Sequence, residues 1–596
     1  MALACLTIYR PYLFGDDGKI GHDYSYFFPY LLSGYYWFLN NGFSTPWFTP
    51  ALCGGIPHFP NPQSLYYSVP QLLLYFAGPL KSVVLTYYIF GALGFLGAYA
   101  LATVRFRQPL VAVFVGLSFM TNGFFLARTQ AGHLSFHAFM LLPLICYLLL
   151  ATTPQTAAGS QHPPVVSRFA LVHRYLGVSS FFPILVAGLL LAYFIHAGAS
   201  VVVVPVGFCL VFTLWLMQPD PKVWVRLALA GLFAICLSAG KLMASAYFMS
   251  LFPRDLYQLP GYENVLVAAY AALMGMVAPF SSDESNALLT HRDFLFGGEE
   301  FDYRIGFALL VACSSVFFIR PQSVNRRSVI RVTVILLVLV LPLVINTYEV
   351  DWQRLLKSLP YFSTVSSLVR WNLVYILPTI ILSGWVWSEC YLRWGKISDV
   401  ALGIGLLIVM ALPLTYGYDG APRSYDSVVV TSAFDHAEAT GEIPVILHLE
   451  ESLVDGYRLS VVGTGDALTR GASQVVCNEP AFGYRLENFR FDPVFQGDTF
   501  AIHGGAYNFY RPECLQFPAD NMCRPGTRFD PADAGDLSLF VSWHPFVFEQ
   551  PVWQLIANGI SIVTAFMLCL YLSIRMGRLG FDLLAGFYRQ VVSRRL

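Results

Sequence analysis

The chain has 596 residues, of which 56% are hydrophobic and only 12% are charged, and its net charge at pH 7 is zero. A soluble protein carries about 25% charged residues, so this chain has too few to cover a core of its size with a water-facing surface. The zero net charge also excludes nucleic acid as an expected partner. We therefore expect an all-α polytopic integral membrane protein that contacts membrane lipids.

Apolar runs of membrane-spanning length recur along the chain. A bilayer span needs ~20 mostly apolar residues, and about twelve runs are of that order. The first run is too short to span, and we expect it to be the tail of a first transmembrane helix that a late start codon has clipped. The expected spans are Met1–Tyr12 (partial), Lys81–Val104, Pro109–Leu126, Leu134–Ala151, Ser179–His196, Ser200–Met217, Leu227–Phe248, Ile305–Ile319, Val332–Asn346, Leu373–Ser388, Asp399–Thr415 and Val552–Ile574.

The loops between these spans alternate in length and charge. One set is short and rich in Lys and Arg, which is typical of cytoplasmic loops. The other set is longer, mixed in charge and rich in Pro, Gly and aromatic residues. We expect both termini in the cytoplasm and the longer loops outside a bacterial inner membrane. The longer loops are Leu13–Leu80, Arg128–His133, Leu251–Arg304, Tyr348–Trp371 and Tyr416–Pro551.

The segment 416–551 is the one soluble domain that the sequence predicts; it is expected to be periplasmic. Short runs of β-forming residues broken by Gly, Pro, Asp and Asn predict a small β-rich domain, for which a sandwich is preferred. Cys514 and Cys523 are expected either to form a disulfide in an oxidising compartment or to remain free thiols. The transmembrane domain is then 1–415, and 552–596 is the last span with a basic cytoplasmic tail. The expected strands are Ile443–Glu450, Tyr457–Gly463, Ser473–Cys477, Thr499–His503 and Leu537–Trp543.

The first long loop carries a candidate catalytic carboxylate. Asp23 stands just before an aromatic amphipathic segment, at the expected outer face of the membrane. A carboxylate within hydrogen-bond reach of an acceptor hydroxyl acts as a general base. The alternative interpretation is an ordinary helix-capping or turn aspartate. Asp16 and Asp17 precede Asp23 without the following aromatic and proline residues, so they rank lower.

Basic residues near the expected outer face are candidates for binding a lipid-linked phosphate, because paired guanidinium donors match its oxygens. The alternative for each is an interfacial side chain that extends to the lipid headgroups. His133 ends a helix at the same face and is either a further contact in this set or a satisfied interfacial histidine. The arginine candidates are Arg128, Arg254, Arg292 and Arg370.

Two further features place charge where it needs an explanation. Lys241 lies in an apolar run, and an intramembrane lysine is costly, so it is either a functional residue that binds substrate or a marker of a water-filled cavity. Glu299 and Glu300 are hard carboxylate ligands for a divalent metal such as Mg²⁺ or Mn²⁺. A solvated loop pair is the preferred interpretation of these two glutamates, and the sequence indicates no other cofactor.

Several motifs combine into a pattern that resembles a known family. They are Asp23, Pro29, Gly54-Gly55-x-Pro57, Asn61-Pro62-Gln63, Pro70, Arg128-x-x-x-Gly132-His133 with Pro143, Phe301-Asp302-Tyr303-Arg304-Ile305-Gly306, and Pro360-Tyr361-Phe362 leading to Arg370-Trp371. The pattern resembles the bacterial GT-C-type glycosyltransferases, especially the YfhO-like group, over roughly residues 20–390. Before Arg370 that group usually shows a second Arg and a Pro, where this chain has Val365, Ser366 and Ser367.

The resemblance implies a multi-helix enzyme that moves a sugar from a polyprenyl-phosphate carrier to a glycan or lipid acceptor at the outer face. Asp23 matches the position of that group's catalytic base, and inversion at the anomeric carbon is expected. The alternatives are a transporter or flippase of a lipid-linked saccharide, and a non-catalytic envelope assembly protein with the β-rich domain as its binding part. The long first loop with a membrane-proximal Asp23 favours the enzyme.

Overall fold

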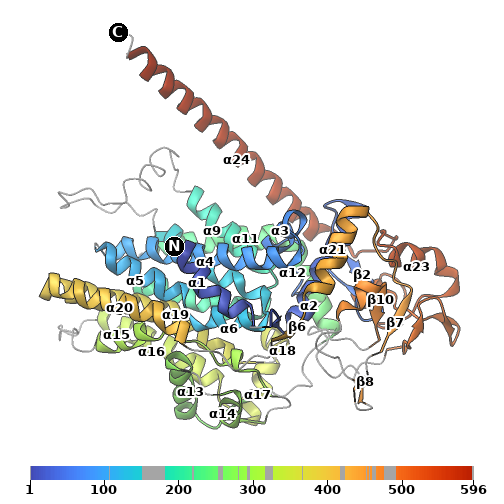
Figure 1. The fold of residues 1–596 in the computed structure, drawn as a ribbon, viewed down its shortest axis with the longest axis horizontal. Coiled ribbons are helices and arrows are strands. Elements are labelled where there is room, and N and C mark those ends of the chain that lie inside the picture. Colours follow the sequence, from blue (N-terminus) through green and yellow to red (C-terminus); the bar gives the residue numbers. More distant parts are fainter. Residues whose placement is uncertain are drawn as a thin grey trace.

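The computed structural model is mostly helical, with a body of long helices and, at its other end, a smaller region that contains most of the short strands (Figure 1). It describes residues 2–15, 17–106, 108–150, 181–217, 221–252, 259–278, 281–291, 295–315, 326–365, 367–415, 423–451, 453–454, 457–458, 465–475 and 491–593.

Within these described residues, five helical stretches are long and apolar enough to cross a membrane, and six if two helices that meet at a sharp bend count as one. Their apolar composition and their length fit a membrane span, because a helix of ~20 apolar residues crosses the hydrocarbon layer of a bilayer. The five are α4 (Pro79–Arg105); α5 (Pro109–Met120) with α6 (Gly123–Ala131); η2 (Ser200–Val202) with α10 (Val203–Met217); η5 (Val369–Tyr375) with α19 (Ile376–Trp394); and Val552–Arg575 of α24 (Val552–Ser593).

The predicted number of about twelve spans is not confirmed. Other predicted spans correspond to shorter helices, or to helices whose side chains are described only in part. The shorter helices are α1 (Ala2–Leu13), η1 (Leu134–Leu141) with α7 (Leu142–Leu150), α9 (Phe182–His196) and α15 (Phe307–Cys313). The partly described helices are α16 (Arg326–Ile345) and α20 (Lys396–Thr415).

The single span predicted for Leu227–Phe248 is instead a bent pair. Helices α11 (Pro221–Leu237) and α12 (Ala239–Leu251) meet at an angle of 72°. Polar side chains of α24 satisfy the backbone groups near the break. The N–H of Gly240 donates to Ser561 Oγ (3.0 Å), and its carbonyl accepts from the Gln554 side-chain amide (3.0 Å). A broken helix at membrane depth needs such partners, because lipid offers none.

The segment 416–551 is not confirmed as a β-rich sandwich, because its described residues mix short strands with helices. The middle strand of its one three-stranded sheet is β7 (His448–Glu450), which is parallel to β10 (Ala472–Gln474) and antiparallel to β11 (Gly497–Asp498). Its helices are α21 (Val428–Thr440), η6 (Gly465–Arg470), α22 (Pro512–Gln516), η8 (Pro531–Asp533) and α23 (Ala534–Val541).

Helix α23 occupies most of the predicted strand Leu537–Trp543, so that prediction is wrong. The buried side chains Leu537, Phe540 and Val541 recur at the i, i+3, i+4 spacing of a helix rather than at the alternate positions of a strand. The remaining elements are β1 (Ile20–Gly21), α2 (Tyr24–Asn41), β2 (Phe48–Thr49), β3 (Ile56–Pro57), α3 (Val69–Ala77), β4 (Gly261–Tyr262), α13 (Val265–Val277), α14 (Ser282–Ala287), β5 (Leu289–Thr290), η3 (Gly298–Glu300), α17 (Val350–Lys357), α18 (Pro360–Ser363), β6 (Arg423–Tyr425), β8 (Leu453–Val454), β9 (Tyr457–Arg458), β12 (Ile502–His503) and β13 (Ala506–Tyr507).

The first long loop, 13–80, and the segment 416–551 pack into one body. The N–H of Gly54 donates to Ser473 Oγ (3.0 Å), and the Gly54 carbonyl accepts from the N–H of Tyr510 (2.8 Å). Buried hydrophobic residues of both segments belong to the same continuous core as those of the helical body. The region near β7 is therefore joined to the loop that carries Asp23.

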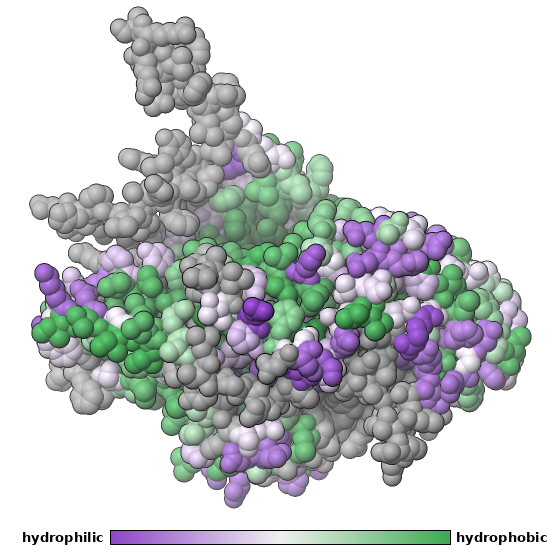
Figure 2. Space-filling model, viewed as in Figure 1, coloured by the Kyte–Doolittle hydropathy of each residue, from purple (hydrophilic) through white to green (hydrophobic). Residues whose placement is uncertain are grey.

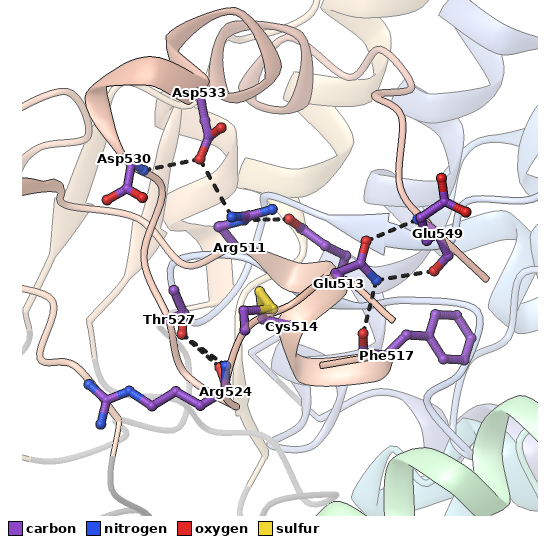
Figure 3. Close-up of a disulfide and its surroundings, with 11 residues drawn as sticks. Arg511, Glu513, Cys514, Phe517, Arg524, Thr527, Asp530, Asp533 and Glu549 are labelled. Carbon is purple, nitrogen blue, oxygen red and sulfur yellow. Dashed lines mark hydrogen bonds and ion pairs between the residues drawn. A yellow bond between two sulfur atoms is a disulfide. The ribbon is translucent and has the colours of Figure 1, made fainter. Parts of the chain in front are cut away.

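The disulfide predicted as one alternative is present, between Cys514 and Cys523. Figure 3 shows its surroundings, where Arg511 lies between Glu513 (2.6 Å) and Asp533 (3.6 Å). Cys53 is also disulfide-bonded, and the free thiols include Cys146, Cys209, Cys236, Cys313, Cys390 and Cys569.

Hydrophobic residues cover much of the surface of the helical body, whereas hydrophilic residues gather toward the end that carries α21 and α23 (Figure 2). The span Val552–Arg575 of α24 is an extreme case, since only 6% of its most apolar window is buried within the protein. A helix with so many exposed apolar side chains is stable in hydrocarbon and costly in water. The surface supports the assignment as a membrane protein.

Candidate functional site

The end of α6 places His133 in the site. Gly132 follows α6 in the left-handed region, with φ at +104°, which residues with a side chain rarely adopt. The N–H groups of Gly132 and His133 both donate to the carbonyl of Arg128, at 3.0 and 2.9 Å. This cap ends the helix and turns His133 toward the start of α2.

The backbone before α2 passes unusually close to α6. A Cβ atom at Gly21 would lie 2.0 Å from the carbonyl oxygen of Gln130, so only glycine fits. The N–H of Asp23 donates to the carbonyl of Ala131 (3.0 Å). On its other side β1 pairs antiparallel with β6, which comes from the distant segment 423–425. Asp23 is thus fixed over the end of α6 by backbone contacts.

The Asp23 carboxylate lies between two imidazoles. Its Oδ2 is 2.5 Å from His133 Nε2, and its Oδ1 is 3.3 Å from His22 Nε2. Asp23 occupies the N-cap position of α2, but its side chain makes no capping hydrogen bond. The structure therefore does not favour the helix-capping interpretation. The Asp23 side chain is 33% exposed, and the Nδ1 atoms of both histidines are buried without a hydrogen-bond partner.

The charge on Asp23 is stable at neutral pH. Burial raises the pKa of the Asp23 carboxyl, but His133 and His22 together lower it by more, so the pKa lies below its ordinary value. Glu300 raises the pKa only weakly. The carboxylate is therefore ionised, partly exposed and held in one orientation, which are the requirements for a general base or an electrostatic stabiliser.

A buried ion-pair layer lies beneath this carboxylate. Arg370 holds Glu300 with two parallel bonds, Nη2 to Oε1 at 2.5 Å and Nε to Oε2 at 2.8 Å. Arg128 donates to the carbonyl of Glu299 and lies 3.5 Å from Glu300 Oε2. Burial alone would raise the pKa of Glu300, but the two arginines lower it to about 2. The layer is a paired, rigid support.

Arg128 is enclosed by aromatic rings as well as by these oxygens. Its guanidinium lies over the Phe124 ring at 4.1 Å from the centroid, with Tyr303 and Phe136 at 5.5 and 5.8 Å. Its side chain is only 1% exposed. Such cation–π contacts stabilise a desolvated arginine. Arg128 therefore supports the site from within, and it is not exposed to bind a phosphate directly.

Glu299 is the second unusual carboxyl of the site. It is buried, and its Oε2 has no hydrogen-bond partner. Burial raises the pKa of Glu299, His133 lowers it, and the charges on Glu300 and Asp23 raise it further, so the pKa lies above its ordinary value. Asp23 and Glu299 thus have pKa values shifted in opposite directions, a pattern typical of acid and base pairs in active sites.

Lys241, which lies in an apolar run of the sequence, binds the first long loop. Its Nζ donates to the carbonyls of Phe59 and Asn61, the latter at 2.5 Å, and lies 5.1 Å from the Phe59 ring centroid. Burial and the nearby Lys241 lower the pKa of His58 to about 3, so that this buried imidazole is neutral. Lys241 thus has an evident role in holding residues 58–61 against the bend of α12.

The remaining predicted site residues divide into two groups. Asp16, Arg254 and Arg292 lie outside the described residues. Glu299 and Glu300, the predicted metal ligands, are described, and Glu300 is bound by two guanidinium groups rather than directed at an open position. Among the described residues, no three His, Cys, Asp or Glu side chains come together as a metal site.

Two features of the site were missed by sequence reasoning. His22 precedes Asp23 directly and carries a recognisable signal, because a histidine beside a candidate base is chemically suggestive. The segment 423–425 gave no such signal, because three residues of short β-strand carry little pattern of their own. The Asp23–His133 contact joins residues far apart in sequence, which only the fold brings together.

No family model, characterised protein or solved structure matches the chain. The function is therefore argued from the geometry of the site.

Proposed function

We propose that the chain is a bacterial inner-membrane glycosyltransferase of the GT-C type, which moves a sugar from a polyprenyl-phosphate carrier to a glycan or lipid acceptor. The observation that carries the proposal is the Asp23 carboxylate, ionised, one-third exposed and fixed between His22 and His133. It stands on a loop that packs against apolar helices of membrane-spanning length, which supports a lipid-linked donor.

The reaction is a single displacement. The acceptor hydroxyl attacks the anomeric carbon and passes its proton to Asp23, while the bond from that carbon to the phosphate oxygen breaks. The electron pair leaves with polyprenyl phosphate, and the configuration inverts. His133, whose Nε2 lies 2.5 Å from Asp23 Oδ2, donates to the carboxylate and stabilises it before the transfer, and Asp23 keeps the proton that it accepts.

The leaving phosphate needs cationic partners. Among the described candidates, the side chains of Arg370 and His133 are 16% and 15% exposed, whereas Arg128 and Lys241 are almost fully buried. We assign direct phosphate contact to Arg370 alone and support of the site to the two buried cations, because Nε2 of His133 is bound to Asp23 and its Nδ1 is buried. The loops 13–80 and 416–551 lie on the periplasmic side in this proposal, and both termini are cytoplasmic.

The test replaces the base and keeps its shape. Asp23→Asn should insert and fold normally, but its transfer rate should be at least ~100-fold lower. This factor is the lower end of the rate contribution of a general base. Purified protein in lipid nanodiscs is assayed with a panel of polyprenyl-phosphate sugars, and product is measured by mass spectrometry. Asp17→Asn is the matched control, because Asp17 is an exposed loop aspartate paired only with Lys19.

Near-normal transfer by Asp23→Asn would show that the base lies elsewhere, with Glu299 as the next candidate. A panel in which no polyprenyl-phosphate sugar serves as donor would reject the enzyme. One observation favours the transporter alternative in that case: the bent pair α11 and α12, since broken helices form substrate sites in transporters. Flipping of a fluorescent lipid-linked saccharide in proteoliposomes would then be the decisive measurement.

A further inference from the structure

Helix α13 lies in the loop 251–304, which the sequence places wholly outside the membrane. Its thirteen residues, Val265–Val277, contain no charged side chain. The side facing the protein is made of small residues, Ala268, Ala272 and Gly275, which are buried. The other side is apolar and exposed.

The exposed face of α13 is a continuous stripe. Leu266 is 81% exposed, and Tyr270, Leu273 and Val277 are 49%, 46% and 38% exposed. Their spacing of i, i+4, i+7 and i+11 puts them on one side of the helix. Large apolar side chains rarely form such a stripe in contact with water. We call the four residues the α13 stripe.

Both ends of α13 are attached to the helical body. Just before it, the N–H of Tyr262 donates to the carbonyl of Asn346, at the end of α16 (2.7 Å). At its other end, the carbonyls of Gly275 and Met276 accept from the N–H groups of Tyr303 (2.9 Å) and Ile305 (3.0 Å). A Cβ atom at Gly275 would lie 2.7 Å from the carbonyl oxygen of Phe301, so the close approach requires glycine.

The apolar surface next to α13 continues onto α16. The two helices are in contact, with α13 at the lower edge of Figure 1 and α16 above it. Helix α16 exposes its own large apolar side chains, among them Leu336, Leu337 and Val340. This continuity, and the lack of a charged side chain on α13 itself, identify hydrocarbon as the occupant of the stripe.

We propose that α13 is embedded in the leaflet on the Asp23 side of the membrane, with the α13 stripe in contact with lipid chains. Thirteen helical residues extend only ~20 Å, too short to cross the ~30 Å hydrocarbon layer. The helix therefore lies within one leaflet. Its bonds to Tyr303 and Ile305 tie that leaflet to the segment that carries Glu299 and Glu300, so the candidate site opens at the lipid surface.

The test measures the depth of α13 without relying on activity. The free thiols that are not buried, Cys236, Cys313 and Cys569, are replaced by serine. One cysteine is then introduced as Leu273→Cys and labelled with an environment-sensitive fluorophore in full-length protein in nanodiscs. We expect quenching by lipids that carry a doxyl group on the acyl chain and little quenching by aqueous iodide. Leu539→Cys on α23 is the matched control, because the Leu539 side chain is 42% exposed. A label at this position should be quenched by iodide alone.

Strong iodide quenching at position 273 would overturn the proposal, because the stripe would then face water. Quenching by neither reagent would also overturn it, since a protein surface, such as a second copy of the chain, would then cover the stripe. Leu266→Cys, at the other end of the stripe, repeats the measurement at a second position. It guards against a label at position 273 that disturbs the local structure. Neither outcome depends on whether Asp23 is a catalytic base.

Discussion

At the scale of single residues, the contact between Asp23 and His133 makes a prediction about pH. His133 lowers the pKa of the Asp23 carboxyl, so His133→Ala should raise that pKa toward or above its ordinary value. A base must be ionised to act, and the acidic limb of the transfer rate should therefore move to higher pH. The measurement is the transfer rate in nanodiscs over a pH range that begins at about pH 3, because the acidic limb of the unchanged protein lies below the ordinary 3.8 of an aspartate.

The control for this shift is His436→Ala, because His436 is an exposed histidine on α21. It should leave both the rate and the limb unchanged. A His133→Ala variant with a lower rate but an unmoved limb would show that His133 only shapes the site. An unmoved limb and an unchanged rate would remove His133 from the mechanism altogether.

Glu300 makes a second prediction, about stability. Its pKa of about 2 lies below the ordinary 4.5, so its pairing contributes stability that is complete above pH 4.5 and is lost as pH falls toward 2. Glu300→Gln leaves Arg128 and Arg370 without their counter-ion, and breaking a buried pair costs about 3–5 kcal/mol. The midpoint of thermal unfolding at neutral pH should fall accordingly.

The comparison for Glu300→Gln is Glu263→Gln, at an exposed loop position, which should change stability by less than about 0.5 kcal/mol. Added Mg²⁺ or Mn²⁺ should not restore the Glu300 variant. Restoration by either ion would contradict the ion-pair interpretation and return the two glutamates to the predicted metal site.

At this scale the sequence indicated Asp23 as a candidate but did not predict its surroundings. A loop aspartate followed by aromatic residues is visible in one stretch of sequence, and Gly132-His133 is visible in another. Their meeting depends on the left-handed Gly132 and on the close passage of Gly21. The segment that each glycine packs against cannot be predicted from the residues around it, because backbone proximity between distant segments has no local sequence pattern.

At the scale of elements, Lys241 links α12, next to its bend with α11, to the first long loop. Lys241→Met keeps most of the length of the side chain but removes both bonds to the carbonyls of Phe59 and Asn61. Hydrogen bonds to a charged group contribute about 1.5–3 kcal/mol each. We expect faster amide hydrogen exchange in residues 58–64 and a lower unfolding temperature.

Lys396→Met is the matched control, since Lys396 is an exposed residue at the start of α20. It should leave exchange in residues 58–64 unchanged. Unaltered exchange in the Lys241 variant would show that the loop is held by its other contacts, such as the bond from Asn61 to the Tyr30 hydroxyl (2.8 Å).

The elements that the sequence predicted well are those set by composition alone. Spans such as α4 and Val552–Arg575 follow from long apolar runs. The bend at Ser238 was missed because the polar partners of the break come from α24, far along the chain. The strand predicted at Leu537–Trp543 was wrong because a short apolar run has no length to separate period 2 from period 3.6.

At the scale of the whole molecule, the segment 416–551 depends on the first long loop. It shares a core with that loop and bonds to Gly54 through Ser473 and Tyr510. Expressed alone, it should lack a cooperative thermal transition, because the apolar side chains that share a core with the first long loop would face water. Circular dichroism and intrinsic fluorescence during heating provide the measurement.

Co-expression with residues 13–78 is the corresponding positive control, and it should restore a sharper transition. A cooperative transition for 416–551 alone would show that the segment is an independent domain, as the sequence suggests. The polar composition and turn residues of 416–551 distinguish it from the membrane body, but composition does not reveal which other segment completes a core.

The pairing of β1 with β6 has a consequence for biosynthesis. A ribosome delivers Ile20 early and Tyr425 some four hundred residues later, after most of the apolar helices have entered the membrane. Until then the backbone beside Asp23 lacks its neighbour, and the carboxylate is held on one side only. Completion of the site is therefore deferred to the last third of translation, and a nascent chain that stalls before β6 displays Asp23 without the scaffold that orients it.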